Sequence, residues 1–189
     1  MAHGSPVGDE VLAGESPAGS TAIELAATGF DVVELLELLG SGLAALHAVD
    51  GSDCPFDAGN ADLLDRASAA VGAGTVDPDR FDRAYSRSTP TDLLRIVADS
   101  VPADPPVPVV VHGAARLDVV RVDAGRIVGW DAVERAGLGD PYRDLATMAT
   151  SLVDVVGPEA LGPFLDAYGI DHADVLRLDW HVMIDQLLR

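Results

Sequence analysis

The stretch that decides the fold is PVPVVVHGAARLDVVRVDAGRIVGWDAVERAGLGDPYRDLA, residues 106–146. A β-branched run at residues 109–111 predicts a buried strand that leads directly into a His-Gly pair. Residues 117–122 and 126–130 flank an Asp-Ala-Gly and predict a hairpin, because glycine supplies the positive φ of its turn. A glycine-rich turn then leads through Asp140-Pro141 into a helix. The stretch therefore predicts a small β structure that ends in a polar loop next to a helix.

Helices are expected on both sides of this stretch. Apolar residues recur at helical spacing from about Asp31 to Ala48, and Asp31 is the expected N-cap. Asp57 and Asp171 are the expected caps of two later helices. The further helices are expected at residues 57–72, from Pro90 onward, and at 141–154, 158–168 and 171–188, and the segment 77–88 is either a solvated loop or a short helix. The predicted fold class is α+β, mainly helical, with a small β-hairpin insertion.

The first thirty residues differ in composition from the rest. Residues 1–22 are rich in Gly, Ser, Pro and Ala, and predict a loose entry into the domain. Short strands are expected near Val11-Leu12 and from Thr21 to Leu25. Neither strand could form a domain alone, so residues 31–189 are expected to hold the folded unit.

Charge and cysteine content exclude several classes of partner. The 189 residues carry 12 basic and 31 acidic side chains, and the net charge of −19 opposes binding to nucleic acids and to anionic membranes. All twelve basic residues are arginine, and the single cysteine, Cys54, excludes an internal disulfide framework. The N-terminal residues lack the pattern of a signal peptide, and the sequence lacks an apolar run that could span a membrane. A cytoplasmic protein is expected.

Several landmarks occur in one order along the chain: LAALHAV at 43–49, DCPFD at 53–57, PFLDAYG at 163–169 and MIDQ at 183–186. Together with residues 106–146, this order resembles the aminoglycoside phosphotransferases, a kinase-like family, and especially their 3' branch. The resemblance covers roughly four fifths of the chain, and ordered landmarks are more specific than a single motif. It implies that residues 31–189 form a kinase-like C-terminal lobe. Residues 1–30 would then be the hinge and last strand of an N-terminal nucleotide lobe that is largely missing.

The resemblance also implies where the catalytic groups would lie. The family uses a His-Gly-Asp motif for the base, an Asn five residues later and a second Asp for magnesium, and a strand Lys for the nucleotide phosphates. Here Ala114 occupies the base position, Val119 the Asn position and Ala132 the position of the magnesium Asp, and the chain contains no Lys. A methyl group neither accepts a proton nor binds a hard cation. Asp118 and Asp131 each lie one residue from an expected ligand, and only a bulge or a shifted turn would bring Asp131 into the site.

The retained motif residues are His112, Gly113, Asp140 and Asp144. The resemblance implies that the His and the two Asp side chains tie the loop to the following helix by hydrogen bonds. A buried network of this kind is costly to remove in part. A structural role is therefore the preferred interpretation of all four residues, and no metal ligand is expected among them.

The acidic loop that receives cationic substrates in the family is also altered. Asp79, Asp82 and Asp185 resemble a remnant of it, but Arg80 and Arg83 interrupt it and would repel a polycation. The three acids are therefore read either as a pocket for a cationic small molecule or as a solvated acidic surface.

Three hypotheses of function follow. The preferred one is a catalytically inactive pseudoenzyme that acts as a binding or scaffolding module and needs no cofactor. The first alternative is a weak or repurposed phosphotransferase of a small hydroxylated substrate, which would use ATP and magnesium held by Asp131 or Asp118. The second is a binding protein for a cationic ligand. A homodimer or a protein partner is expected to cover the face left by the missing nucleotide lobe, near residues 109–111 and the hairpin.

Overall fold

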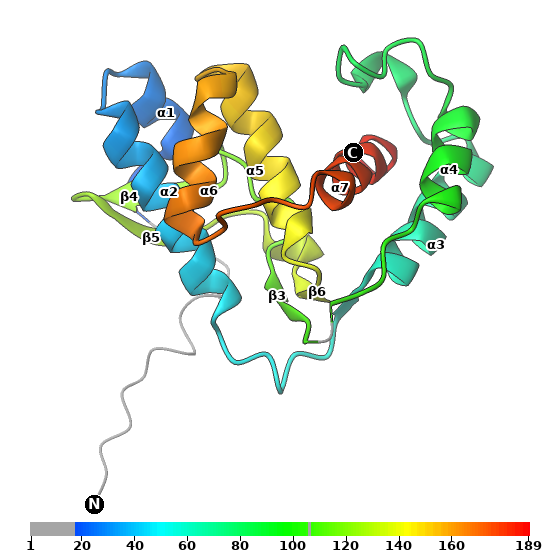
Figure 1. The fold of residues 1–189 in the computed structure, drawn as a ribbon, viewed down its shortest axis with the longest axis horizontal. Coiled ribbons are helices and arrows are strands. Elements are labelled where there is room, and N and C mark those ends of the chain that lie inside the picture. The colour runs from blue at the N-terminus through cyan, green and yellow to red at the C-terminus, as the bar shows by residue number, and fades with distance from the viewer. Residues whose placement is uncertain (1–17, 106) are drawn as a thin grey trace, which may run out of the picture.

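The computed structural model of the protein describes residues 18–105 and 107–189, and the strand expected near Val11-Leu12 lies outside them. The expected α+β, mainly helical architecture is confirmed (Figure 1). The helices within these residues are α1 Ala22–Ala27, α2 Val32–His47, α3 Asn60–Ala73, α4 Pro90–Asp99, α5 Tyr142–Val155, α6 Leu161–Tyr168 and α7 Val175–Leu188. The strands are β1 Ser20–Thr21, β2 Asp57–Ala58, β3 Val109–Val111, β4 Val120–Asp123, β5 Arg126–Trp130 and β6 Gly137–Gly139, and 3-10 turns occupy η1 Pro78–Arg80, η2 Val133–Arg135 and η3 Pro158–Ala160.

Two hydrophobic clusters stabilise the fold. The first joins α2, α5 and α6 to the β4–β5 hairpin, and Leu39, Leu117 and Phe164 are fully buried in it. The second joins α3 and α4 to α7 around Trp180, whose indole N–H donates to the backbone carbonyl of Val97 over 2.9 Å. Helix α7 contacts α5 on one side and α3 and α4 on the other, as Figure 1 shows. This C-terminal helix therefore links the two halves of the domain.

The β4–β5 hairpin belongs to a sheet of order β1-β4-β5. Its two-residue turn is formed by Ala124 and Gly125, and both have positive φ, as a turn that matches the strand twist requires. The register shifts between Arg121 and Val122, so the hairpin contains the kind of bulge that could redirect a following side chain.

A second sheet has the order β2-β6-β3, with β6 parallel to β2 and antiparallel to β3. The glycine-rich segment expected as a turn forms its central strand, β6, so that expectation was wrong. Glycine is needed at this strand because a Cβ on Gly139 would lie 2.5 Å from the carbonyl oxygen of Ala58. Gly137 and Gly139 are therefore explained by the close approach of β6 to the backbone at β2, and not by a turn.

The helix expected at residues 31–48 is confirmed, and Asp31 caps it by accepting the N–H of Glu34. Two other caps were wrong. Asp57 lies in β2 and its carboxylate accepts the N–H of Gly59, so α3 begins only at Asn60. Helix α7 begins after Asp174, which accepts the N–H of Arg177, and not at Asp171. In both cases the helix begins later than expected, after Gly59 and after Asp174.

The strand expected from Thr21 to Leu25 is also wrong. Thr21 and Glu24 form a reciprocal capping box, in which the N–H of each residue donates to the other's side chain, at 2.8 and 3.3 Å. This local pair starts helix α1 and leaves only Ser20 and Thr21 in strand β1.

The partner surface stays a prediction. Val107, before β3, is 76% exposed, and Val128 in the hairpin is 45% exposed.

Within the two described ranges, no helix combines the length and the apolar character needed to cross a membrane.

The contact between α2 and α6 gives a test of this packing. Gly40 lies in α2, and a Cβ there would lie 2.6 Å from the carbonyl oxygen of Phe164 and 2.7 Å from the Cβ of Ala167. Gly40→Ala should therefore lower the free energy of unfolding by about 2 kcal/mol, although alanine favours helices. Chemical denaturation in urea measures this change.

Gly72→Ala is the matched control, since Gly72 also lies in a helix and a Cβ there would have no neighbour within 4 Å. Here the free energy of unfolding should rise by roughly 0.5 kcal/mol. Equal stabilisation by both substitutions would contradict the close approach of α2 and α6.

Candidate functional site

The carboxylate of Asp144 organises the loop that follows β3. Its side chain is fully buried near the start of α5 and accepts the backbone N–H groups of His112 and Gly113 over 2.6 and 2.7 Å. The Nε2 atom of His47, at the end of α2, lies 3.2 Å from the same carboxylate. Asp144 thus forms the hydrogen bonds expected of it between this loop and the helix, and His47 adds a third partner from α2.

His47 connects this carboxylate to a tyrosine. Its Nδ1 atom lies 2.7 Å from the hydroxyl of Tyr168 in α6. A neutral His47 with its proton on Nε2 can donate to Asp144 and accept from Tyr168. Burial raises the pKa of Asp144, but the hydrogen bonds and charges of His47 and His112 outweigh burial and hold that pKa below its ordinary value. Burial and the nearby Asp144 raise the pKa of Tyr168 to about 12, so Tyr168 keeps its proton at neutral pH.

The side chain of His112 joins two backbone segments. Its Nδ1 atom accepts the N–H of Ala114 over 3.3 Å, and its Nε2 atom donates to the carbonyl oxygen of Asp131 over 2.7 Å. The ring also packs beside Trp130, with 5.7 Å between the ring centroids. His112 therefore fixes the loop at 114 relative to the segment that ends the hairpin.

Asp140 forms a second buried network at the start of α5. It accepts the N–H of Tyr142 over 3.0 Å and forms an ion pair with Arg177. The Nε2 atom of His181 lies 3.2 Å from its carboxylate. Burial raises the pKa of Asp140, yet His181, Tyr142 and Arg177 together lower it below its ordinary value. Asp140 thus ties the segment before α5 to α7.

The three altered positions meet at one cavity. Ala114, Val119 and Ala132 all line a cavity of about 500 Å³ between the loop after β3 and the segment after β5. Ala132 has φ 57° and ψ 49°, a left-handed conformation that asparagine and aspartate adopt more readily than alanine. At each of the three positions the side chain offers only hydrocarbon to the cavity.

The two carboxylates that could replace the missing ligands are placed differently. Asp131 forms an ion pair with Arg121, over 2.6 Å between Oδ2 and Nε, and does not line the cavity. The bulge in the hairpin therefore does not direct Asp131 into it. Asp118 does line the cavity, but its side chain is 60% exposed and lies 3.9 Å from Arg116. His112 is not part of the lining, so neither carboxylate shares this cavity with it.

Two of the three remnant acids converge, and they do so on the chain's own arginine. Arg189 donates to Asp82 over 2.6 and 3.0 Å and to Asp185 over 2.9 Å. Burial lowers the pKa of Arg189, but these two carboxylates outweigh burial and raise it above its ordinary value. Asp79 lies exposed on η1. The guanidinium of Arg189 therefore engages two of the three acids that a cationic ligand would need.

Sequence reasoning missed the basic lining of the cavity. Arg80, Arg116, Arg135 and Arg189 line it together with Glu134, Asp118 and Asp185. A sequence signal exists, because Arg116 and Arg135 follow Ala114 and Ala132 by two and three residues. Their convergence with Arg80 and Arg189 depends on the packing of η1 and α7 next to these loops.

These residues do not fit a magnesium ion. Among residues 18–105 and 107–189, no three His, Cys, Asp or Glu side chains are grouped so that they could hold a metal. The carboxylate of Asp185 is engaged by Arg189, and Asp118 lies beside Arg116. Four guanidinium groups around the cavity would also repel a divalent cation.

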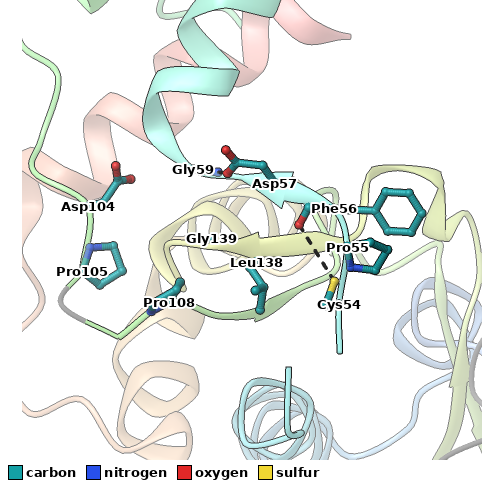
Figure 2. A pocket seen from close by; sticks show the side chains of 10 residues that line it. All are labelled: Cys54, Pro55, Phe56, Asp57, Gly59, Asp104, Pro105, Pro108, Leu138 and Gly139. Carbon is teal, nitrogen blue, oxygen red and sulfur yellow. Dashed lines mark hydrogen bonds between the residues drawn. The ribbon is translucent and has the colours of Figure 1, made fainter. Parts of the chain in front are cut away.

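A second cavity, of about 390 Å³, lies beside strands β2 and β6 (Figure 2). Cys54, Pro55 and Leu138 give it an apolar wall, and Asp57 and Asp104 lie at the start of α3. Both carboxylates accept backbone N–H groups of α3 or its cap, Gly59 at 2.8 Å and Asn60 at 2.9 Å. The carboxylate of Asp104 therefore binds the first N–H of α3, and that of Asp57 binds the N–H of the preceding residue, Gly59.

A helical lobe in which a buried aspartate fixes a His-Gly loop beside a hairpin defines a kinase-like fold. Solved structures show the same fold: the aminoglycoside phosphotransferase APH(3'')-Id of Streptomyces rimosus matches with a TM-score of 0.80 and 24% identity, over 90% of this chain and 66% of that one. An aminoglycoside-3'-phosphotransferase of type VIII matches with a TM-score of 0.78 and 27% identity, over the same shares of the two chains.

The chain belongs to the phosphotransferase enzyme family (APH), whose family model matches residues 10–181. An aminoglycoside 3'-phosphotransferase of Escherichia coli is 31% identical over 172 residues, which are 89% of this chain and 62% of the relative. The chain thus spans about three fifths of the length of the curated relatives it matches.

The Asp144 network can be tested by its effect on stability. Asp144→Asn removes the charge and turns an amide group toward N–H donors, so it should lower the free energy of unfolding by about 3 kcal/mol. Asp154→Asn, an exposed position of the same helix, is the control and should change stability by less than about 0.5 kcal/mol. Urea unfolding at pH 7 compares them.

The pH dependence of protein stability tests the contribution of the ionised Asp144 in a second way. Because the folded-state pKa of Asp144 is lowered, its stabilisation is present above the unfolded pKa of about 3.9 and is lost as the pH falls through the lower folded pKa. The stability difference between wild type and Asp144→Asn should therefore shrink below about pH 4. A difference that stayed constant down to acid unfolding would contradict an ionised Asp144.

Proposed function

We propose that this chain is a catalytically silent member of the phosphotransferase enzyme family that acts as a binding or scaffolding module. The observation that carries the proposal is the convergence of Ala114, Val119 and Ala132 on one cavity. Phosphoryl transfer needs a group that accepts or orients the proton of the attacking hydroxyl and a cation that neutralises the transferred group. The hydrocarbon side chains at these three positions supply neither the proton acceptor nor ligands for the cation. Only the positioning of substrates could then contribute to the rate of phosphoryl transfer.

The buried networks support the same proposal. Asp144 and His112 hold the loops at 114 and 131 by hydrogen bonds that need no nucleotide. A family member that had lost its chemistry but still needed a shaped cavity would keep these residues, because their loss would unfold the loops. The structural residues and the chemical residues of the site are thus separable.

The alternative proposal is a weak phosphotransferase that acts on a small hydroxylated substrate. One observation favours it, since Asp118 lines the cavity and could contribute a single carboxylate to a magnesium ion. Its 60% exposure and the nearby Arg116 weaken that role. Asp131 would first have to leave its ion pair with Arg121.

Binding and transfer assays distinguish the two proposals. Calorimetric titration with MgATP should give no micromolar binding, and transfer of phosphate to an aminoglycoside panel should stay at background. A complete aminoglycoside 3'-phosphotransferase run in parallel shows that the assays detect activity. The silent-module proposal would fail if the chain bound MgATP with micromolar affinity.

Two variants assign any activity that is found. Asp118→Asn and Asp131→Asn should leave the background of the transfer assay unchanged. Transfer by the wild type that one of these substitutions abolished would establish the phosphotransferase alternative and identify its metal ligand. Arg121→Gln is a useful comparison, because it frees Asp131 from its ion pair without removing the carboxylate.

A further inference from the structure

The cavity at the altered positions is lined by four arginines and three acids, although the molecule as a whole is strongly acidic. Four of the chain's twelve basic residues line it, although the net charge is −19. They come from separate parts of the chain: Arg80 from η1, Arg116 from the loop before β4, Arg135 from η2 and Arg189 from the end of α7. The fold therefore gathers these charges in space.

Two of the four guanidinium groups keep their charge without a carboxylate partner. Within the described part of the chain, no carboxylate lies within 4.0 Å of the guanidinium of Arg80 or of Arg135. Arg135 donates one hydrogen bond, over 2.7 Å, to the carbonyl oxygen of Leu188, which orients the group but does not neutralise it. Arg116 has only the 3.9 Å contact with Asp118. Arg189, by contrast, pairs with two carboxylates, Asp82 and Asp185, so these three side chains hold one positive and two negative charges.

A buried arginine adds to the positive potential. Arg143, in the first turn of α5, is 5% exposed, and its Nη1 atom has no hydrogen-bond partner among the described residues. Burial, opposed by the charge of Asp144 and assisted by those of Arg66 and Arg135, lowers the pKa of Arg143 to about 10. Arg143 therefore stays protonated at neutral pH and lies close enough to Arg135 for their charges to interact.

The acids of the lining compensate this charge only in part. Asp185 is engaged by Arg189, while Asp118 and Glu134 are exposed to solvent, where water screens them. The small apolar side chains of Ala114, Val119 and Ala132 complete the lining of the cavity. Its volume of about 500 Å³ is in the ordinary range for a small-molecule site.

We propose that this cavity binds, without a metal, a small organic ligand that carries an oxyanion head, either a phosphate monoester or a carboxylate. Arg80, Arg116 and Arg135 would contact the head, because guanidinium groups bind such oxyanions through paired N–H donors. The methyl groups of Ala114, Val119 and Ala132 would contact the body of the ligand. This inference rests on the proposed loss of catalysis, since a metal-dependent transferase would need oxygen ligands where the cavity has the hydrocarbon side chains of Val119 and Ala132.

The test is a titration of the full chain with inorganic phosphate, in EDTA and again in magnesium, followed by calorimetry or by protein NMR. Succinate replaces phosphate in a parallel arm. Phosphate or succinate should bind in EDTA with a dissociation constant of about 1 mM or below. Binding of phosphate alone would identify a phosphoryl head, and binding of both would identify a general oxyanion site.

Three variants locate the binding. Arg80→Gln and Arg116→Gln should each weaken it about fivefold or more, because each removes a charged donor. Arg95→Gln is the control and should leave it unchanged, since Arg95 is exposed on α4 and pairs only with Asp99 at 3.6 Å. Ala132→Asp should abolish binding by placing a negative charge in the cavity, at a backbone conformation that aspartate tolerates.

The outcomes separate this inference from the proposed function. No binding in either buffer, or equal weakening by Arg95→Gln and Arg80→Gln, would overturn the oxyanion site and leave the silent module untouched. Phosphate binding by the wild type that required magnesium would overturn both, because it would show that the cavity still functions with a metal.

Discussion

The buried carboxylate of Asp144 is the interaction on which the site depends. It lies near the first turn of α5 and binds the two successive N–H groups of the His112-Gly113 pair. The N–H groups of a sharp loop have no partner in a strand or helix, and leaving them buried without one would cost on the order of 1–3 kcal/mol each. Gly113, with φ 84°, allows the turn, because a Cβ there would lie 2.2 Å from the carbonyl oxygen of Arg135.

Further hydrogen bonds connect the Asp144 carboxylate, through His112, to the loops that line the cavity. His112, held through its backbone, uses its ring to fix Ala114 and Asp131. These contacts set the distance between the two segments whose side chains would carry the chemistry in an active family member. The shape of the site is therefore stabilised by one set of residues and its reactivity would depend on another, so the second set can change without loss of the first.

Much of the fold could be predicted because its signals are local. The apolar spacing and the Asp31 cap predicted α2, and the Ala124-Gly125 turn predicted the hairpin. Errors arose where two local signals competed or where close packing gave glycine another use. Thr21 and Glu24 formed a capping box in a segment that was expected to be a strand. The glycines of β6 were interpreted as a turn, whereas they permit close approach to β2.

By itself the sequence determined the family resemblance, the Asp144 and His112 framework, and the absence of acidic or amide side chains at residues 114, 119 and 132. These are properties of residue identity and order, which the chain carries without folding. Tertiary structure alone decided where the charges meet. Asp131 pairs with Arg121, Arg189 pairs with Asp82 and Asp185, and Arg80 and Arg135 line one cavity. Such pairings join residues far apart in the chain, and their energies depend on distance and burial, which no spacing in the sequence specifies.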